Sequence, residues 1–244
     1  MKRTLFVMLL FVTYSACNFT YAGDLKLGLS IYYGNSSHSN TEVPWPTSCS
    51  CVADASSGRG YFLGLVAEFF EDVILDDVFV LRIGVQAMPM KDNARIAYDL
   101  EMMVDGVPQV VKADCNYGIA ADLNAATLDF MYKVSIAGTG FAFSVGPSVS
   151  YFYDNNLKTE LTILKPENAV FTDTQGKIKN YIDEKVPDAE DFRIGLKAGL
   201  QYDINLDIFK IALGAFYDNG FTDFTKGGWN INNLIFGLDF MLNL

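Results

Sequence analysis

The chain has 244 residues, of which half are apolar and 14% aromatic, and its net charge is −11. This length suits one or two domains with a sizeable core, and the apolar fraction excludes a disordered or fibrous protein. Nucleic acid binding requires clustered Lys and Arg, which so acidic a chain does not offer, so we expect no nucleic acid partner.

Residues 1–22 carry the three-part pattern of a secretory signal peptide. Two basic residues precede an apolar run over 5–12, and small residues before Ala22 place the cleavage there. A lipoprotein signal cleaved before Cys17 is the alternative, and the sequence does not decide between them. The apolar run is too short to cross a bilayer as a helix. We therefore expect a signal peptide over 1–22 and one domain over 23–244 that leaves the cytoplasm.

Apolar and polar residues alternate with a period of two along the rest of the chain. This pattern is typical of strands with one apolar and one polar face. Stretches of about ten residues also suit strands that cross a bilayer at a tilt. The predicted strands are 25–33, 61–69, 79–87, 127–136, 141–153, 192–204, 209–217 and 234–244.

The predicted connections alternate between short and long, which is the layout of an outer-membrane barrel with periplasmic turns and external loops. Short turns are expected at 71–77, 137–140 and 205–207, and long loops at 35–59, 90–124, 154–190 and 221–231. Within the long loops, Asp105-Gly106 between apolar runs predicts a hairpin of 94–104 with 107–114, and a second hairpin is expected of 159–164 with 169–172. Such hairpins either stiffen the rim or present an exposed strand to a partner.

Three features indicate that the apolar face is the outer one. It carries large residues on every predicted strand, more than a small barrel can enclose. Eight glycines lie on the opposite face, where a narrow interior needs small side chains. The aromatic residues of the apolar face gather at two heights, as on a surface embedded in a bilayer. They are Tyr33, Tyr61, Tyr151, Tyr153, Phe192 and Tyr217 toward the loops, and Phe69, Phe79, Phe141, Tyr202, Phe209 and Phe240 toward the turns.

The chain resembles the small outer-membrane β-barrel families of Gram-negative bacteria, in particular the PorT-like outer-membrane β-barrel domain. The resemblance rests on the signal peptide, the alternating strands, the stretch Val145-Gly146-Pro147-Ser148-Val149-Ser150-Tyr151 and the stretch Arg193-Ile194-Gly195-Leu196. The chain ends in Leu244, whereas many such barrels end in Phe. Pattern and resemblance together predict an all-β fold, an eight-stranded antiparallel up-and-down transmembrane β-barrel in the cell outer membrane of a Gram-negative bacterium.

The polar face is expected to hold a network of paired charges inside the barrel. Its members are Lys26, Glu68, Arg82, Asp129, Lys133, Arg193, Lys197, Asp203, Lys210 and Asp239, with Asp218 on the same face. Eight strands enclose little more than their own side chains, so we expect these charges to plug the lumen. An ion path or a proton relay is the alternative.

The only histidine, His38, lies in the first long loop beside Ser39. Some eight-stranded outer-membrane barrels are lipid A acyltransferases or deacylases that use His with Ser, so this pair could act as base and nucleophile. A loop rich in Ser and Asn does not hold two such groups rigidly. We therefore expect a solvated histidine, no catalytic residue, and no metal or cofactor.

Cys49, Cys51 and Cys115 fall in the first two long loops. Thiols outside the inner membrane tend to form disulfides. A bridge between Cys49 and Cys51 would close a strained ring, so we expect Cys115 to bridge to one of them. With one histidine and no Cys-x-x-Cys motif in the sequence, a zinc site has little support.

The sequence predicts a non-enzymatic outer-membrane barrel whose long loops serve a structural, adhesive or partner-binding role. Its expected surroundings are outer-membrane lipid and lipopolysaccharide, with the barrel-assembly machinery as a partner during insertion and an unknown extracellular or envelope partner at the loops. A small lipid-modifying enzyme is the first alternative, and a soluble calyx-type binding protein is the second.

Overall fold

The structure is a computed structural model that describes residues 25–42, 52–70 and 77–243. The predicted signal peptide, Cys49, Cys51 and most of the first short turn lie outside these residues. The described chain forms eleven strands. They are β1 (Lys26–Glu42), β2 (Val52–Phe70), β3 (Asp77–Ala87), β4 (Met90–Val104), β5 (Val107–Ser135), β6 (Phe141–Lys165), β7 (Ala169–Phe171), β8 (Ile178–Lys185), β9 (Phe192–Asn205), β10 (Phe209–Gly220) and β11 (Asn230–Asn243).

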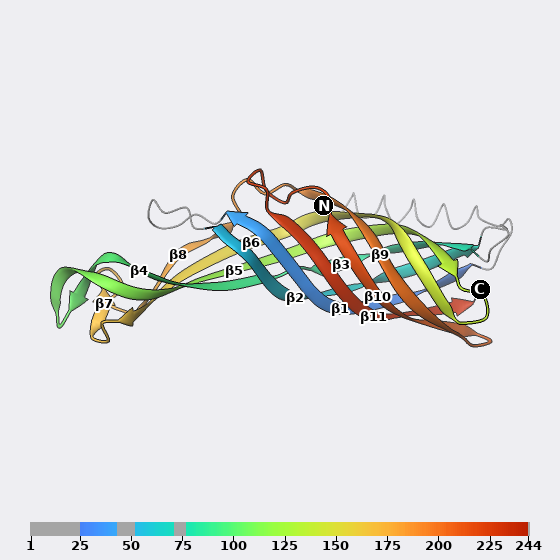
Figure 1. Ribbon diagram of the computed structural model, residues 1–244, viewed down its shortest axis with the longest axis horizontal. Coiled ribbons are helices and arrows are strands. Elements are labelled where there is room, and N and C mark those ends of the chain that lie inside the picture. Colours follow the sequence, from blue (N-terminus) through green and yellow to red (C-terminus); the bar gives the residue numbers. More distant parts are fainter. Residues whose placement is uncertain (1–24, 43–51, 71–76, 244) are drawn as a thin grey trace.

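Eight of these strands close into an antiparallel barrel, as predicted. Their order around the ring is β1, β2, β3, β5, β6, β9, β10 and β11, and β11 pairs with β1 to complete the ring (Figure 1). The register that starts at Leu27 returns, after one circuit, to β1 at Ser37. This stagger means that the strands tilt against the barrel axis, as closure of a small barrel requires.

Three strands lie outside the ring and build an elongated extension at one end of the barrel. We call this part, residues 90–123 and 154–190, the extension; it forms the long arm at the left of Figure 1. It consists of β4, β7 and β8 together with the outer halves of β5 and β6. The complete strands β5 and β6 are 29 and 25 residues long, so they run through both the barrel and the extension. The long loops predicted at 90–124 and 154–190 are therefore mostly strand.

The two predicted hairpins of the extension have different outcomes. The first is formed as predicted, since β4 and β5 pair through a turn in which Asp105 and Gly106 both have positive φ, 50° and 81°. The second prediction is wrong, because β7 pairs with the end of β4 and not with β6. The outer half of β6 pairs with β8 instead. A short apolar run predicts a strand but not the strand with which it pairs. Here β4 and β6 lie at opposite edges of the extension sheet, and β7 adds to β4 whereas β8 adds to β6.

The predicted first loop, 35–59, is also largely strand. β1 and β2 continue their pairing beyond the apolar band, as far as Glu42 opposite Val52. Small and polar residues fill this stretch, and they hide the alternation from a pattern based on apolar side chains.

The two faces of β5 exchange their character where the barrel passes into the extension. In the barrel half, Leu128 and Phe130 point outward and are exposed, whereas Asp129 and Lys133 point inward and are buried. In the outer half the inward positions are apolar and buried, namely Ala113, Cys115, Tyr117, Ile119, Ala121 and Leu123. The barrel is thus apolar outside and charged inside, whereas the extension is polar outside and apolar inside.

A β-bulge gives the neighbouring strand β6 the same exchange, because it changes which side chains of β6 point inward. Asn124 pairs with Asp154 but Ala125 pairs with Phe152, so Tyr153 is the extra residue. Inward positions of β6 are even-numbered up to Phe152 and odd-numbered from Leu157 onward. The bulge lies at the height of the outer aromatic residues, where the apolar exterior ends.

Two separate apolar clusters correspond to these two parts. One lies in the extension and at its base and includes Met102, Tyr117, Leu161, Phe224 and Trp229. The other lies within the charged lumen, and its members are Tyr32, Phe62, Val66, Val78, Val80, Met131, Ala212, Phe216, Ile235 and Met241. The alternation suggested a purely polar inner face, but the inner face of the barrel also carries this apolar cluster. Among the described residues no helix is long and apolar enough to cross a membrane.

Candidate functional site: the charged lumen, its outer mouth and the extension

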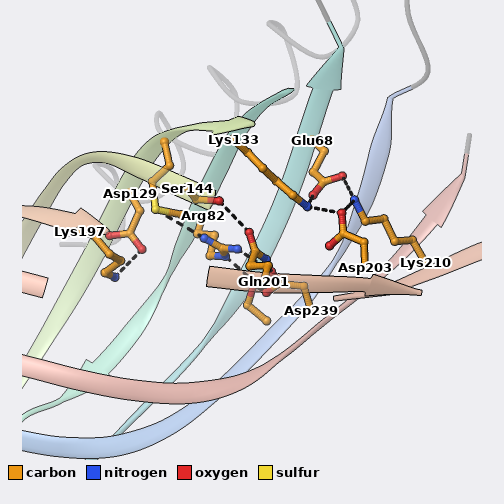
Figure 2. A network of polar contacts seen from close by, with 12 residues as sticks. Glu68, Arg82, Asp129, Lys133, Ser144, Lys197, Gln201, Asp203, Lys210 and Asp239 are labelled. Carbon is orange, nitrogen blue, oxygen red and sulfur yellow. Dashed lines mark hydrogen bonds and ion pairs between the residues drawn. The ribbon is translucent and has the colours of Figure 1, made fainter. Parts of the chain in front are cut away.

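A closed ring of four charges lies at the turn end of the lumen. Lys133 binds Glu68 at 2.9 Å and Asp203 at 2.6 Å, and Lys210 binds the same two carboxylates at 2.8 and 2.6 Å. Figure 2 shows these four side chains converging from β2, β5, β9 and β10. Each carboxylate bridges two ammonium groups, so the ring has no net charge. Lys26, which pairs in register with Glu68, lies half-buried at this end.

The middle of the lumen is held by Arg82 and Asp239. The guanidinium donates to the carboxylate at 2.6 Å, and both side chains are buried (Figure 2). Asp239 also accepts hydrogen bonds from Ser30 at 2.5 Å and from Gln201 at 3.2 Å. The guanidinium carbon lies 4.7 Å from the centroid of the Phe216 ring, a cation–π contact.

Two further ion pairs follow toward the extension. Lys197 donates to Asp129 at 2.6 Å, and Arg193 donates to Asp218 at 2.9 Å and to the carbonyl of Ile231 at 2.8 Å. All four side chains are buried.

Apart from Lys26, the structure therefore divides the predicted network into four neutral groups along the lumen. Apolar side chains of the lumen cluster contact their cations: Phe216 covers Arg82, and Phe62 lies 5.6 Å from the ammonium group of Lys197. A hydrated ion would have to break these pairs to pass, which is costly in a water-poor interior. The arrangement fits a plug.

The outer mouth of the lumen corrects the prediction for His38. This residue lies in β1, not in a solvated loop, and its side chain is fully buried. The indole nitrogen of Trp229 donates to its Nδ1 at 3.1 Å, and Trp229 packs edge-on against Phe224. Burial lowers the pKa of His38 to about 4. His38 is therefore neutral at physiological pH.

The geometry around His38 does not form a nucleophile and base pair. His38 and Ser39 are adjacent in a strand, so their side chains point to opposite faces. Ser56 pairs with His38 across the ladder and is buried on the same face. However, Trp229 donates to Nδ1, so the proton of the neutral imidazole is on Nε2, which cannot accept a proton from a hydroxyl.

Cys115 is a free, buried thiol on the inner face of β5 in the extension. The predicted bridge from Cys115 to Cys49 or Cys51 is thus not present in this structure. The alternation places Cys115 between Ala113 and Tyr117 in the apolar cluster, away from the outer surface. Burial raises the pKa of its thiol to about 11, so the reactive thiolate is scarce at neutral pH.

The outer face of the extension carries a shallow polar groove. Its volume is about 420 Å³, and its floor is formed by Gly118 and Ala120 of β5. Lys91 and Lys158 lie on the two flanking strands, β4 and β6. Among the described residues, no group of three or more His, Cys, Asp or Glu side chains is arranged to hold a metal ion.

Sequence reasoning missed Trp229, Ser56 and Gln201, which complete the mouth and the middle of the lumen. Trp229 lies 191 residues from His38 in the chain. A lone Trp in a predicted loop is a weak signal of burial, and only the closure of β11 on β1 brings the two rings together.

Comparisons with known proteins give structural similarity without a family. No protein-family model matches the chain, and no curated protein matches it. Among solved structures, the chain is similar to Ail, the attachment invasion locus protein of Yersinia pestis in complex with the heparin analogue sucrose octasulfate, with 12% identity and a TM-score of 0.36 over 90% of this chain and 99% of that one. Neisserial surface protein A gives 10% identity and a TM-score of 0.33 over 91% and 100% of the chains. The outer membrane protease OmpT from Escherichia coli gives 10% identity and a TM-score of 0.35 over 92% and 98%.

Proposed function

We propose that this chain is a non-enzymatic outer-membrane barrel that displays its extension outside the cell to bind a partner. The barrel anchors the extension, and its lumen carries no solute. Adhesion and partner binding fit the rigid arm better than a purely structural role, because a barrel alone would suffice as an anchor.

The exchange of faces along β5 carries this proposal. In the barrel its outward side chains are apolar and exposed, and neighbouring strands match it: Leu29, Leu65 and Phe236 are each more than half exposed. So continuous an apolar exterior requires lipid around it. In the extension the same strand turns polar side chains outward and apolar ones inward, as a water-soluble domain does. A soluble calyx would not show this change, so the soluble alternative loses its support.

Catalysis is not part of the proposal. The lipid-modifying alternative rested on His38, which is buried, neutral and held by Trp229. A general base needs a pKa near the working pH and contact with the proton it takes. His38 offers neither.

Tag accessibility on intact cells tests the proposed arrangement. One variant carries an epitope tag after Gly106, at the tip of the extension, and the matched variant carries it after Gly138, in a short turn of the barrel. Both glycines have open space around the α-carbon, so both turns should accept an insertion. We expect antibody to bind the first tag on intact cells and the second only after permeabilisation.

Two results would contradict the proposal. One is equal exposure of both tags on intact cells. The other is recovery of the untagged protein as a soluble monomer without detergent, because a lipid-facing exterior would then aggregate. In mild detergent the folded barrel should also migrate differently on a gel before and after boiling.

A further inference from the structure

The sheet of the extension has a long free edge on β4. Within the described residues, β4 pairs with β2 at Lys91 only and with β7 from Met102 onward. Between these points, over Asp92–Glu101, no strand of the described chain pairs with this edge. Ten residues of extended strand span about 33 Å, and their unpaired amide and carbonyl groups are a template for another strand.

The short strand β7 shows the line that an added strand would follow. It pairs antiparallel with β4 for three residues, and its Phe171 amide then donates to the carbonyl of Gly176, just before β8. At the tip of the extension, β7 therefore lies between β4 and the start of β8. After Phe171 the chain turns away, and the line of β7 toward the barrel is left open.

The opposite border of this opening is β8, which pairs with β6 and, among the described residues, with no strand on its other side. We call the opening between Asp92–Glu101 of β4 and Ile178–Lys185 of β8 the seam. Ile96 and Leu100 of β4 and Ile182 of β8 pack against the cluster of the extension but are only partly buried. A strand in the seam would cover these side chains and form hydrogen bonds with the unpaired backbone groups at the edges of β4 and β8.

The negative charge of the extension indicates that a strand bound in the seam would be basic. Residues 90–123 and 154–190 contain eight Lys and Arg against fourteen Asp and Glu, a net charge of −6. On β4, Asp99 and Glu101 are exposed and form no ion pair within the described residues. A basic partner would be steered to this surface, whereas a second copy of the chain, with the same −6, would be repelled.

We propose that the seam binds an extended, basic segment of a partner protein, which adds as a strand antiparallel to β4 along the line of β7. Its inward side chains are apolar and cover Ile96 and Leu100, and its outward side chains are Lys or Arg and face Asp99 and Glu101. This inference rests on the proposed function, because it requires the extension to be exposed outside the cell.

Hydrogen exchange with short peptides tests the inference on the purified protein in detergent. The probe is a ten-residue peptide of alternating Lys and Val, and its counterpart alternates Glu and Val. We expect the Lys-Val peptide to slow exchange of backbone amides over 92–101 and 178–185 and to leave β10 unchanged. The Glu-Val peptide should slow neither segment.

Paired charge variants separate the seam from general attraction. Asp99→Lys/Glu101→Lys should weaken binding of the Lys-Val peptide about tenfold or more, because it reverses the two exposed acidic groups of β4 that the outward Lys side chains of the peptide would face. Asp122→Lys/Glu190→Lys makes the same charge change at exposed positions outside β4 and β8 and should change binding less than threefold.

The outcomes distinguish the alternatives. Equal binding of both peptides, or equal loss in both variants, would overturn the inference. Slow exchange, without any peptide, of those amides over 92–101 that point away from β5 would mean that the chain itself or a second copy occupies the seam, and sedimentation would show the second copy as a dimer. If the tip tag is exposed on cells and the barrel is heat-modifiable, then failure of the peptide experiment concerns the seam alone.

Discussion

Replacement of Arg82 by Leu should destabilise the barrel strongly. Arg82 and Asp239 meet at 2.6 Å, with both side chains at most 2% exposed. Without the guanidinium, Asp239 keeps only Ser30 and Gln201 as donors, and neither carries a charge. Breaking a buried ion pair from one side costs about 3–5 kcal/mol, most of it from the carboxylate left without a counterion.

The matched control is Arg95→Leu in the extension. Arg95 also binds one carboxylate, Asp114, but its side chain is 64% exposed. Water screens such a pair, so its loss should leave the free energy of unfolding almost unchanged. The double variant Arg82→Leu/Asp239→Leu should recover much of the loss, because no charge remains buried alone.

Urea unfolding in mild detergent, followed by the gel mobility of unboiled samples, measures the free energy of unfolding of each variant. The expected order is wild type and Arg95→Leu together, then the double variant, then Arg82→Leu. If Arg82→Leu were no less stable than Arg95→Leu, the pair would not be shielded from water, and the description of a plugged lumen would be wrong.

Four other results are expected. Protein in planar bilayers should show no stable unitary conductance at neutral pH, and neither should Arg82→Leu, because three other neutral charge groups remain in the lumen; a reproducible large conductance would contradict the plug. When the pH falls from 6.5 to 5, the wild type should lose about 2 kcal/mol of stability that His38→Leu does not lose. Histidine in the unfolded chain takes up a proton near pH 6.5, whereas the pKa of buried His38 is about 4, so acid favours the unfolded state. Parallel pH profiles of the two proteins would argue against a buried neutral imidazole. In unfolding experiments Gly146→Ala should cost about 1–3 kcal/mol, because a Cβ there would lie 2.0 Å from the carbonyl oxygen of Phe130. Gly118→Ala should be nearly neutral, because the nearest atom to its Cβ would lie 3.3 Å away. Cys115 should react with a maleimide only after unfolding, and rapid labelling of the folded protein would show that the thiol is accessible.

The alternation of apolar residues predicted the barrel well because lipid contact imposes it on every membrane-crossing strand. Phe141, Phe143 and Val145 point outward for one common reason, and a period of two reports it directly. The glycines and charges of the other face followed from the narrow lumen.

The same reasoning failed where that common cause ends. Beyond Ala125 the faces of β5 exchange character, and in β6 the bulge at Tyr153 shifts the period by one residue. A search for one continuous pattern interprets such stretches as loops. Partners such as Trp229 for His38 depend on which strands close the ring, which no local pattern contains.

The strict alternation of outer β6 beyond the bulge also sets a rule for how this arm can change length during evolution. Deleting Tyr153 itself would only remove the bulge, because Asp154 would still pair with Asn124. Deleting one residue of the regular stretch, such as Lys158, would turn over the side chains that follow it, so that Leu161 and Ile163 faced water and Glu160 faced the apolar cluster. Insertions or deletions of two residues, matched on β5 and β6, would instead add or remove one complete rung and leave the phase intact. Homologues should therefore differ in arm length by even numbers of residues per strand, while the membrane-spanning half keeps its length.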